Sequence, residues 1–224
     1  MSIQKIHLRK LLMLMFASNA QRTSVLRADI RDEVRKARGI KGDGGDFHVP
    51  FWHDAKKHVN GEKDLHISVA ERIASHKGRE RLYAELRDGF LDWWNHKRRW
   101  TNEPSTSEML SVRGAVEFPN LGATVKVENL LALTIGGSRN RIIYPYFAEE
   151  PKLTADMARL GLWAITESVL DYPTDEFRIL DVIRGRSYAV SDLAFSGGEE
   201  AEFIRLYSAL LVSWKRLWEE YEPA

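Results

Sequence analysis

Apolar side chains in the first hundred residues recur at the three- and four-residue spacing of amphipathic helices. The pattern predicts helices over residues 3–17, from Thr23 or Ser24 to Arg38, from about Asp54, through 67–74 and over 80–98. Thr23 or Ser24 can cap the second helix, and Gly39 supplies a left-handed stop after it. The N-terminal half is therefore expected to be helical.

The pattern changes after Pro104, where alternating and β-branched residues predict strands. Strands are expected over residues 112–118, 123–135, 141–147, 177–182 and 187–190. Two helices accompany them, one capped by Thr154 and one over residues 199–221. Pro145 lacks an amide hydrogen, so its strand should lie at a sheet edge or contain a bulge.

Residues 101–107 are rich in Thr, Ser and Pro and form the best candidate linker. We therefore predict an α+β protein with a basic helical region over residues 1–104 and a sheet region over 105–224. The second region should be a small mixed sheet flanked by helices, and the two regions should pack together as one compact unit.

From residue 80 to 182 the expected order is helix, three strands, helix, strand. This αβββαβ order resembles the core of the PD-(D/E)XK, or restriction-endonuclease-like, superfamily. The resemblance implies an acidic residue on the second core strand and a (D/E)-x-K motif on the third, which together hold Mg²⁺. The second strand offers Glu128, but the third, Arg141-Ile-Ile-Tyr-Pro-Tyr-Phe147, has neither a carboxylate nor a lysine.

The missing motif leaves two readings of a nuclease-like core. In one, the core is degenerate, and the protein needs no cofactor. In the other, a rearranged Mg²⁺ site uses Glu117, Glu128 or Asp181, carboxylates on or near the expected strands. Asp181 also precedes Arg184, and a turn held by an Asp–Arg pair is the simpler interpretation of that segment.

The chain has no cysteine, which excludes disulfides, thiolate metal sites and cysteine nucleophiles. Its longest apolar run, residues 11–17, is far shorter than the ~20 residues needed to cross a bilayer. Basic residues precede this run, but no signal-peptide cleavage site follows it. We expect a cytoplasmic protein without a membrane anchor.

The formal charge is +1, but the two halves differ in sign. Residues 1–104 contain 21 Lys and Arg against 14 Asp and Glu, whereas residues 105–224 contain 12 against 18. A basic half favours an anionic partner, such as DNA or RNA, or else attraction between the two halves.

Two groups of cations are candidates for contact with phosphates. Arg27, Arg31, Arg35 and Arg38 form one stripe on the second helix, although Asp29, Asp32 and Glu33 can offset that charge locally. Lys97, Arg98 and Arg99 follow Trp93 and Trp94, whose rings are expected in the core.

His48, His53, His58 and His66 lie close together in the sequence. Their spacing does not align them on one helical face, so we assign no metal site and leave open whether His48, His53 and His58 bind a metal.

Three functions remain in view. The first is a non-catalytic nucleic-acid-associated protein or accessory subunit. The second is the divalent-metal-dependent nuclease. The third is a protein-interaction module, because seven tryptophans can form an interface as well as a core.

Overall fold

The computed structural model describes residues 3–40, 47–98, 105–107 and 112–221. The helices are α1 (Leu8–Phe16), α2 (Asn19–Ala37), α3 (His48–Val59), α4 (Leu65–Ser75), α5 (Glu80–Asp92), α6 (Ala155–Ser168) and α7 (Glu199–Glu219). The strands are β1 (Lys5–His7), β2 (Ser105–Ser107), β3 (Gly114–Phe118), β4 (Ala123–Val127), β5 (Leu131–Ile135), β6 (Arg139–Tyr146), β7 (Phe177–Asp181) and β8 (Arg186–Ala189). The α+β class predicted from the sequence is confirmed, with helices dominating the first half and strands the second.

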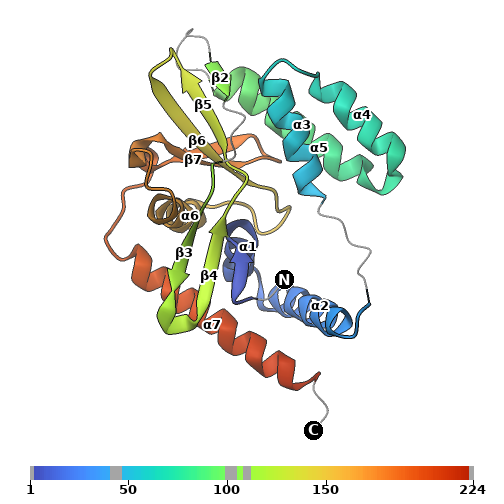
Figure 1. Ribbon diagram of the computed structural model, residues 1–224, viewed down its shortest axis with the longest axis vertical. Helices are drawn as coiled ribbons and strands as arrows, with labels where there is room; N and C mark the ends of the chain where they lie inside the picture. Colours follow the sequence, from blue (N-terminus) through green and yellow to red (C-terminus); the bar gives the residue numbers. More distant parts are fainter. Residues whose placement is uncertain (1–2, 41–46, 99–104, 108–111, 222–224) are drawn as a thin grey trace.

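The strands form two sheets rather than the single sheet expected (Figure 1). One has the order β1-β4-β3, and the other has the order β2-β5-β6-β7-β8. The strand predicted over residues 123–135 is divided between them, because the chain bends at Asn129. Asn129 has φ of 68°, a left-handed conformation that asparagine tolerates better than most residues. The bend ends β4 and sends β5 into the other sheet.

Both faces of the five-stranded sheet are buried. Along β6, Ile142, Tyr144 and Tyr146 point into a core shared with α1, α2, α6 and α7. Ile143 and Phe147 point the other way, into a core shared with α3, α4 and α5. This alternation is the two-residue period of a strand. In Figure 1, α3, α4 and α5 therefore lie on one side of the sheet and α6 on the other.

The two sequence regions share both of these cores. β1 pairs in parallel with β4, and α1 packs against α6 and α7. The helix expected over residues 3–17 therefore begins only at Leu8, because residues 5–7 are extended. The linker expected over 101–107 contains the short strand β2 at its end, and residues 101–104 lie outside the described ranges.

Pro145 lies on β6, which has β5 on one side and β7 on the other. The prediction of an edge strand was therefore wrong for β6 as a whole. Pairing with β5 stops at Ile143, opposite Leu131, because the chain bends away at Asn129. Beyond that point the β5 side needs no amide donor from Pro145, and the lost hydrogen bond costs nothing there.

No helix in the described part of the chain combines the length and apolar character needed to span a bilayer.

Candidate functional site

The second helix, α2, is held in place at its start and along its inner side. Ser18 caps it by accepting a hydrogen bond from the Gln21 amide at 3.2 Å, so the helix begins earlier than the Thr23 or Ser24 cap predicted. Arg22 donates to three carbonyl oxygens near the end of α1: Leu14, Met15 and Ala17. Leu26 and Ile30 are buried against the core. The opposite side of α2 is left to the solvent.

That outer side carries the predicted stripe, which we call the arginine face: Arg27, Arg31, Arg35 and Arg38. All four residues are exposed. Arg27 forms an ion pair with Glu220, with 2.9 Å between Nη2 and Oε2, in which both side chains are about half exposed. No ion pair joins the other three arginines to a carboxylate among the described residues, so their guanidinium groups face water.

The acidic residues of α2 do not neutralise this row. Asp29 is engaged by Lys10, whose Nζ lies 2.5 Å from its carboxylate. Glu33 is about 200° around the helix from Arg31, because successive residues turn by about 100°. Only Asp32 lines the same surface hollow as Arg31 and Arg35. Of the three carboxylates expected to offset the stripe, only Asp32 lies beside it, and no ion pair joins Asp32 to these arginines in the described part of the chain.

Two shallow hollows run along the arginine face. The first, of about 540 Å³, is lined by Ala28, Arg31, Asp32, Val34, Arg35, Arg38 and Tyr221. The second, of about 560 Å³, is lined by Asn19, Ala20, Thr23, Ser24, Arg27 and Arg31. Tyr221, just after α7, adds an aromatic ring to the first hollow, and hydroxyl and amide groups line the second. The two hollows thus place guanidinium groups, the Tyr221 ring and hydrogen-bonding side chains side by side along α2.

The second predicted cation group lies elsewhere and is engaged within the molecule. The chain forms a π-helical turn over Trp93–Lys97, where Lys97 Nζ is 2.5 Å from the Asp92 carboxylate. The Arg98 guanidinium stacks on Trp94, 3.5 Å from the ring centroid. Arg99 lies outside the described residues. Figure 1 shows α5, which leads into this turn, well separated from α2.

The three candidate catalytic carboxylates occupy three different environments. Glu117 is exposed on β3, where it pairs with Thr124 of β4 in the ladder. Glu128 lies at the bend after β4, 3.5 Å from Nδ1 of His7. Asp181 is buried at the end of β7. Among the described residues, no three His, Asp or Glu side chains gather as a metal-binding group.

Asp181 stabilises the turn that follows β7 through an ion pair with Arg184. Its carboxylate lies 3.1 Å from Arg184 Nη1 and accepts a weak hydrogen bond from the Leu153 amide. Burial raises the pKa of Asp181, while Arg184 opposes that increase. Arg184 also donates to the backbone oxygens of Ala148 and Glu149. The pair ties the β7–β8 turn to the loop after β6, in agreement with the simpler interpretation of this segment.

The histidines that cluster in sequence separate in space into individual contacts. His48 stacks on Phe147 with 4.9 Å between ring centroids. His58 accepts a hydrogen bond from the Leu65 amide, and burial lowers its pKa. His53 is 62% exposed beside Asp54, and His66 is exposed at the start of α4. Among the described residues, these histidines therefore do not form a metal-binding group.

Sequence reasoning missed the pair of side chains that hold the bend at Asn129. Trp52 Nε1 donates to the Asn129 oxygen at 2.6 Å, and Lys56 Nζ donates to the Leu130 oxygen at 2.7 Å. Burial lowers the pKa of Lys56 to about 8. The two residues are one helical turn apart on α3. Their carbonyl acceptors come within reach only because the chain bends at Asn129, and no local pattern predicted that bend.

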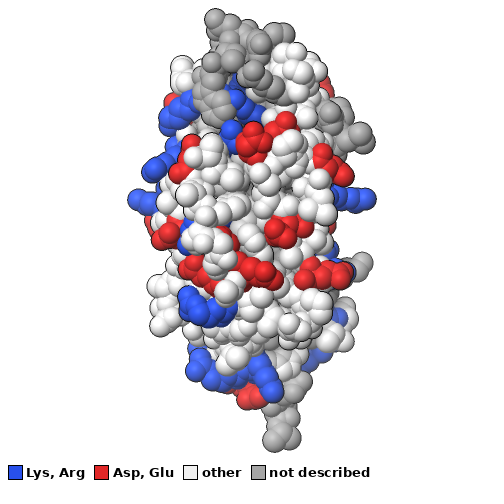
Figure 2. Space-filling view, turned by 90° about the vertical axis from the view of Figure 1, so that its left-hand side faces the viewer, with Lys and Arg blue, Asp and Glu red and all other residues white. Residues whose placement is uncertain are grey.

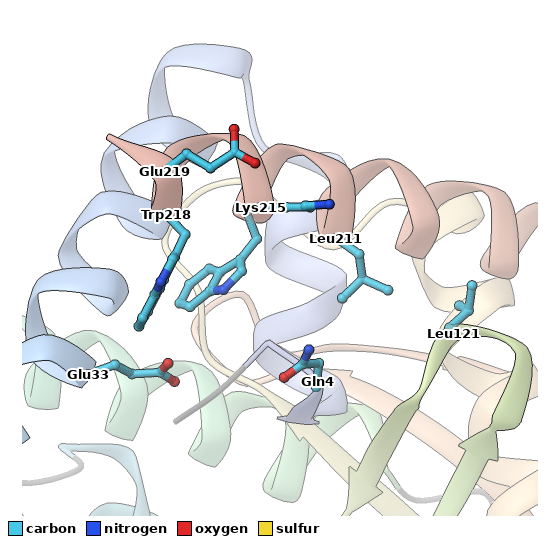
Figure 3. Close-up of a pocket in the computed structure, with 8 residues that line it drawn as sticks. Gln4, Glu33, Leu121, Leu211, Lys215, Trp218 and Glu219 are labelled. Atoms are coloured by element: carbon cyan, nitrogen blue, oxygen red, sulfur yellow. The ribbon is translucent and has the colours of Figure 1, made fainter. Parts of the chain in front are cut away.

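A third hollow, which we call the indole groove, lies beneath α7 (Figure 3). It has a volume of about 580 Å³ and is lined by Gln4, Glu33, Leu121, Leu211, Trp214, Lys215, Trp218 and Glu219. The Trp214 and Trp218 rings stack with 5.9 Å between centroids and 28° between planes. Trp52, Trp93 and Trp214 are buried, whereas Trp94, Trp163 and Trp218 are partly buried and Trp100 lies outside the described residues.

Charges of both signs share the surface. Figure 2 shows one face of the molecule, with acidic side chains in a band across its middle and basic ones along both edges and near its lower end. The charge difference between the two halves of the sequence therefore does not make this face uniformly basic, and any anion-binding surface has to be identified from particular residues.

No family model matches the sequence, and no curated protein is significantly similar to it. A function for this chain therefore has to be inferred from its own geometry.

Proposed function

We propose that this protein binds nucleic acid through the arginine face of α2 and does so without cutting it, as a nucleic-acid-associated protein or accessory subunit. The observation that carries the proposal is the row of exposed arginines on one helix. Arg31, Arg35 and Arg38 have no ion-pair partner among the described residues. Like charges one turn apart repel each other by a few tenths of a kcal/mol, and an anionic partner would remove that cost.

Phosphates are the anion that suits this geometry. Arg27 to Arg38 spans about 16 Å of helix at 1.5 Å per residue, with one guanidinium on each turn. A guanidinium binds phosphate oxygens through paired N–H donors. Tyr221 and the hydroxyl groups of Thr23 and Ser24 lie in the same hollows and supply stacking and neutral hydrogen bonds. Such a surface would recognise the charge and shape of the nucleic-acid backbone rather than its base sequence.

The arrangement of the carboxylates supports the non-catalytic form of the proposal. Glu117 lies on β3, Glu128 at the bend after β4 and Asp181 at the end of β7, where it forms an ion pair with Arg184. The resemblance to PD-(D/E)XK nucleases rests on the expected αβββαβ order, whereas in the described part of the chain five strands lie between α5 and α6 and are divided between two sheets. The metal-dependent alternative makes a different prediction, namely Mg²⁺- or Mn²⁺-dependent cleavage that is lost in Glu128→Ala. Observing that cleavage would overturn the non-catalytic proposal.

Binding is tested by fluorescence anisotropy with labelled single-stranded DNA, duplex DNA and RNA at low ionic strength. The wild-type chain is expected to bind at least one of them, and Arg31→Ala/Arg35→Ala to bind at least tenfold more weakly. Arg113→Ala/Arg205→Ala is the matched control, since it removes the same charge from exposed positions outside α2. Equal losses in both double variants, or no binding by the wild type, would refute the proposal.

A further inference from the structure

The two hollows of the arginine face contain a single carboxylate among the described residues, that of Asp32. Asp32 is exposed, and its side chain forms no ion pair or hydrogen bond within the described part of the chain. Along the helix axis it lies between Arg31 and Arg35, and around the axis it lies about 60° from Arg35. Its carboxylate oxygens therefore remain able to accept hydrogen bonds from a ligand held by these arginines.

A carboxylate in this place does not help to bind phosphate. Asp32 and a phosphate are both negative and both only accept hydrogen bonds, so Asp32 calls for a donor in the ligand. The only hydrogen-bond donor in the backbone of a nucleic acid is the 2′-hydroxyl of ribose, which DNA lacks. Each ribose lies between two phosphates. A strand whose phosphates bind Arg31 and Arg35 therefore brings a sugar to the turn of α2 that carries Asp32.

The neutral end of the arginine face adds further acceptors. Thr23 is one turn before Arg27, and Ser24 is seven residues before Arg31, so their side chains continue the row of arginines. Both residues line the second hollow, and neither hydroxyl forms a hydrogen bond with another described residue. A hydroxyl accepts as well as donates, whereas a guanidinium only donates. Thr23 and Ser24 can therefore bind a ribose hydroxyl, which a purely cationic surface would not do.

We propose that the arginine face prefers RNA to DNA, because Asp32 accepts a hydrogen bond from the 2′-hydroxyl of a ribose whose neighbouring phosphates bind Arg31 and Arg35. This inference rests on the proposed nucleic-acid binding and specifies the kind of strand bound. Acidic side chains bind ribose hydroxyls in the same way in dinucleotide-binding sites. Base amino groups are also donors, but DNA and RNA share them, so they would favour neither strand.

The preference is measured by fluorescence anisotropy with three labelled single strands of one sequence, made of A and C only so that no thymine methyl group distinguishes them. One strand contains ribose, one deoxyribose and one 2′-O-methyl ribose, which keeps the oxygen but cannot donate. The wild-type chain should bind the RNA about tenfold more tightly than the DNA, the usual effect of a hydrogen bond to a charged group. The 2′-O-methyl strand should bind about as weakly as DNA.

Asp32→Ala identifies the acceptor. The variant loses a negative charge as well as the acceptor, so its DNA binding should strengthen slightly, and the ratio of RNA to DNA affinity is the quantity compared. That ratio should fall from about ten to about one. Glu200→Ala is the matched control and should leave the ratio unchanged. It removes an exposed carboxylate from the first turn of α7, about 30 Å along that helix from Glu220, the partner of Arg27.

Three results would each overturn the RNA preference: equal affinities for RNA and DNA, an advantage that the 2′-O-methyl strand retains, or an unchanged ratio in Asp32→Ala. If binding were still weakened by Arg31→Ala/Arg35→Ala, nucleic-acid binding by α2 would stand without the preference. No binding of any strand would refute both proposals. The comparison of the three strands on the wild-type chain decides the preference even if a variant folds poorly.

Discussion

The first turn of α7 contains a buried carboxylate whose charge should contribute measurably to stability. The Glu199 side chain is 3% exposed. It accepts hydrogen bonds from the amides of Ser196 and Gly197, at 2.7 and 2.9 Å, and from Arg159 Nη1 at 2.6 Å. Burial opposes ionisation of Glu199, but these hydrogen bonds outweigh it and lower the pKa to about 2. A carboxylate with a depressed pKa stabilises the folded state when it is charged.

The magnitude is set by the difference in pKa between the folded and unfolded chain. Relative to the ordinary value of 4.5, a folded pKa of about 2 corresponds to about 3 kcal/mol of unfolding free energy at pH 7, at 1.36 kcal/mol per unit. This stability is fully present above pH 4.5 and is lost as the pH falls toward 2. Glu199→Gln keeps the size of the side chain and removes the charge, so it isolates this contribution.

Urea unfolding of wild type and Glu199→Gln at pH 7 and pH 3 checks the prediction. The variant should be less stable by about 3 kcal/mol at pH 7, and the difference should fall to less than half of that at pH 3. Glu202→Gln removes a more exposed carboxylate bound to the same Arg159 and should cost about 1 kcal/mol or less. A difference that does not change with pH, or an equal cost in the control, would refute the reasoning.

Three further predictions concern packing, proton linkage and the ligand. Gly89→Ala should destabilise the fold by about 3 kcal/mol in urea unfolding, because a Cβ there would overlap the backbone oxygens of Val182 and Ile183. Gly78→Ala is the control and should be nearly neutral, because open space surrounds Gly78. Because the pKa of Lys56 is lowered to about 8 in the folded state, wild type should gain stability relative to Lys56→Met as the pH rises from 8 to about 10.5; a constant difference would contradict that pKa. Tyr221→Ala should weaken single-stranded binding about tenfold, with Tyr221→Phe close to wild type, since a stacked base contributes about 1–3 kcal/mol; equal losses in the two variants would argue against stacking.

Periodicity predicted most helices and strands, because burial of one face leaves a local pattern in the sequence. It missed β1, since Ile3 and Ile6 are three residues apart, which is a helical spacing. The three residues of β1 are extended only because β4, more than a hundred residues away, offers a parallel edge. The division of residues 123–135 between two sheets depends on one left-handed residue, Asn129, which has no periodic signature.

The candidate site, like the fold, could be predicted from the sequence only in part. The row of arginines on α2 could be predicted, because i, i+4 spacing fixes which residues share a helical face. The carboxylates that would pair with these arginines could not be predicted, since Asp29 pairs instead with Lys10 of another helix. The separation of Glu117, Glu128 and Asp181 is likewise a property of sheet pairing, and the indole groove exists only because α7 crosses α2 beside the β3–β4 turn.

The salt dependence of binding tests most directly whether the arginines of α2 bind phosphates. For single-stranded DNA, the slope of log K against log salt concentration should be about −3 for four phosphate contacts, at about −0.7 each. Arg31→Ala/Arg35→Ala should reduce its magnitude by about 1.4. A slope near zero for the wild type, or the same slope in the double variant, would contradict the claim.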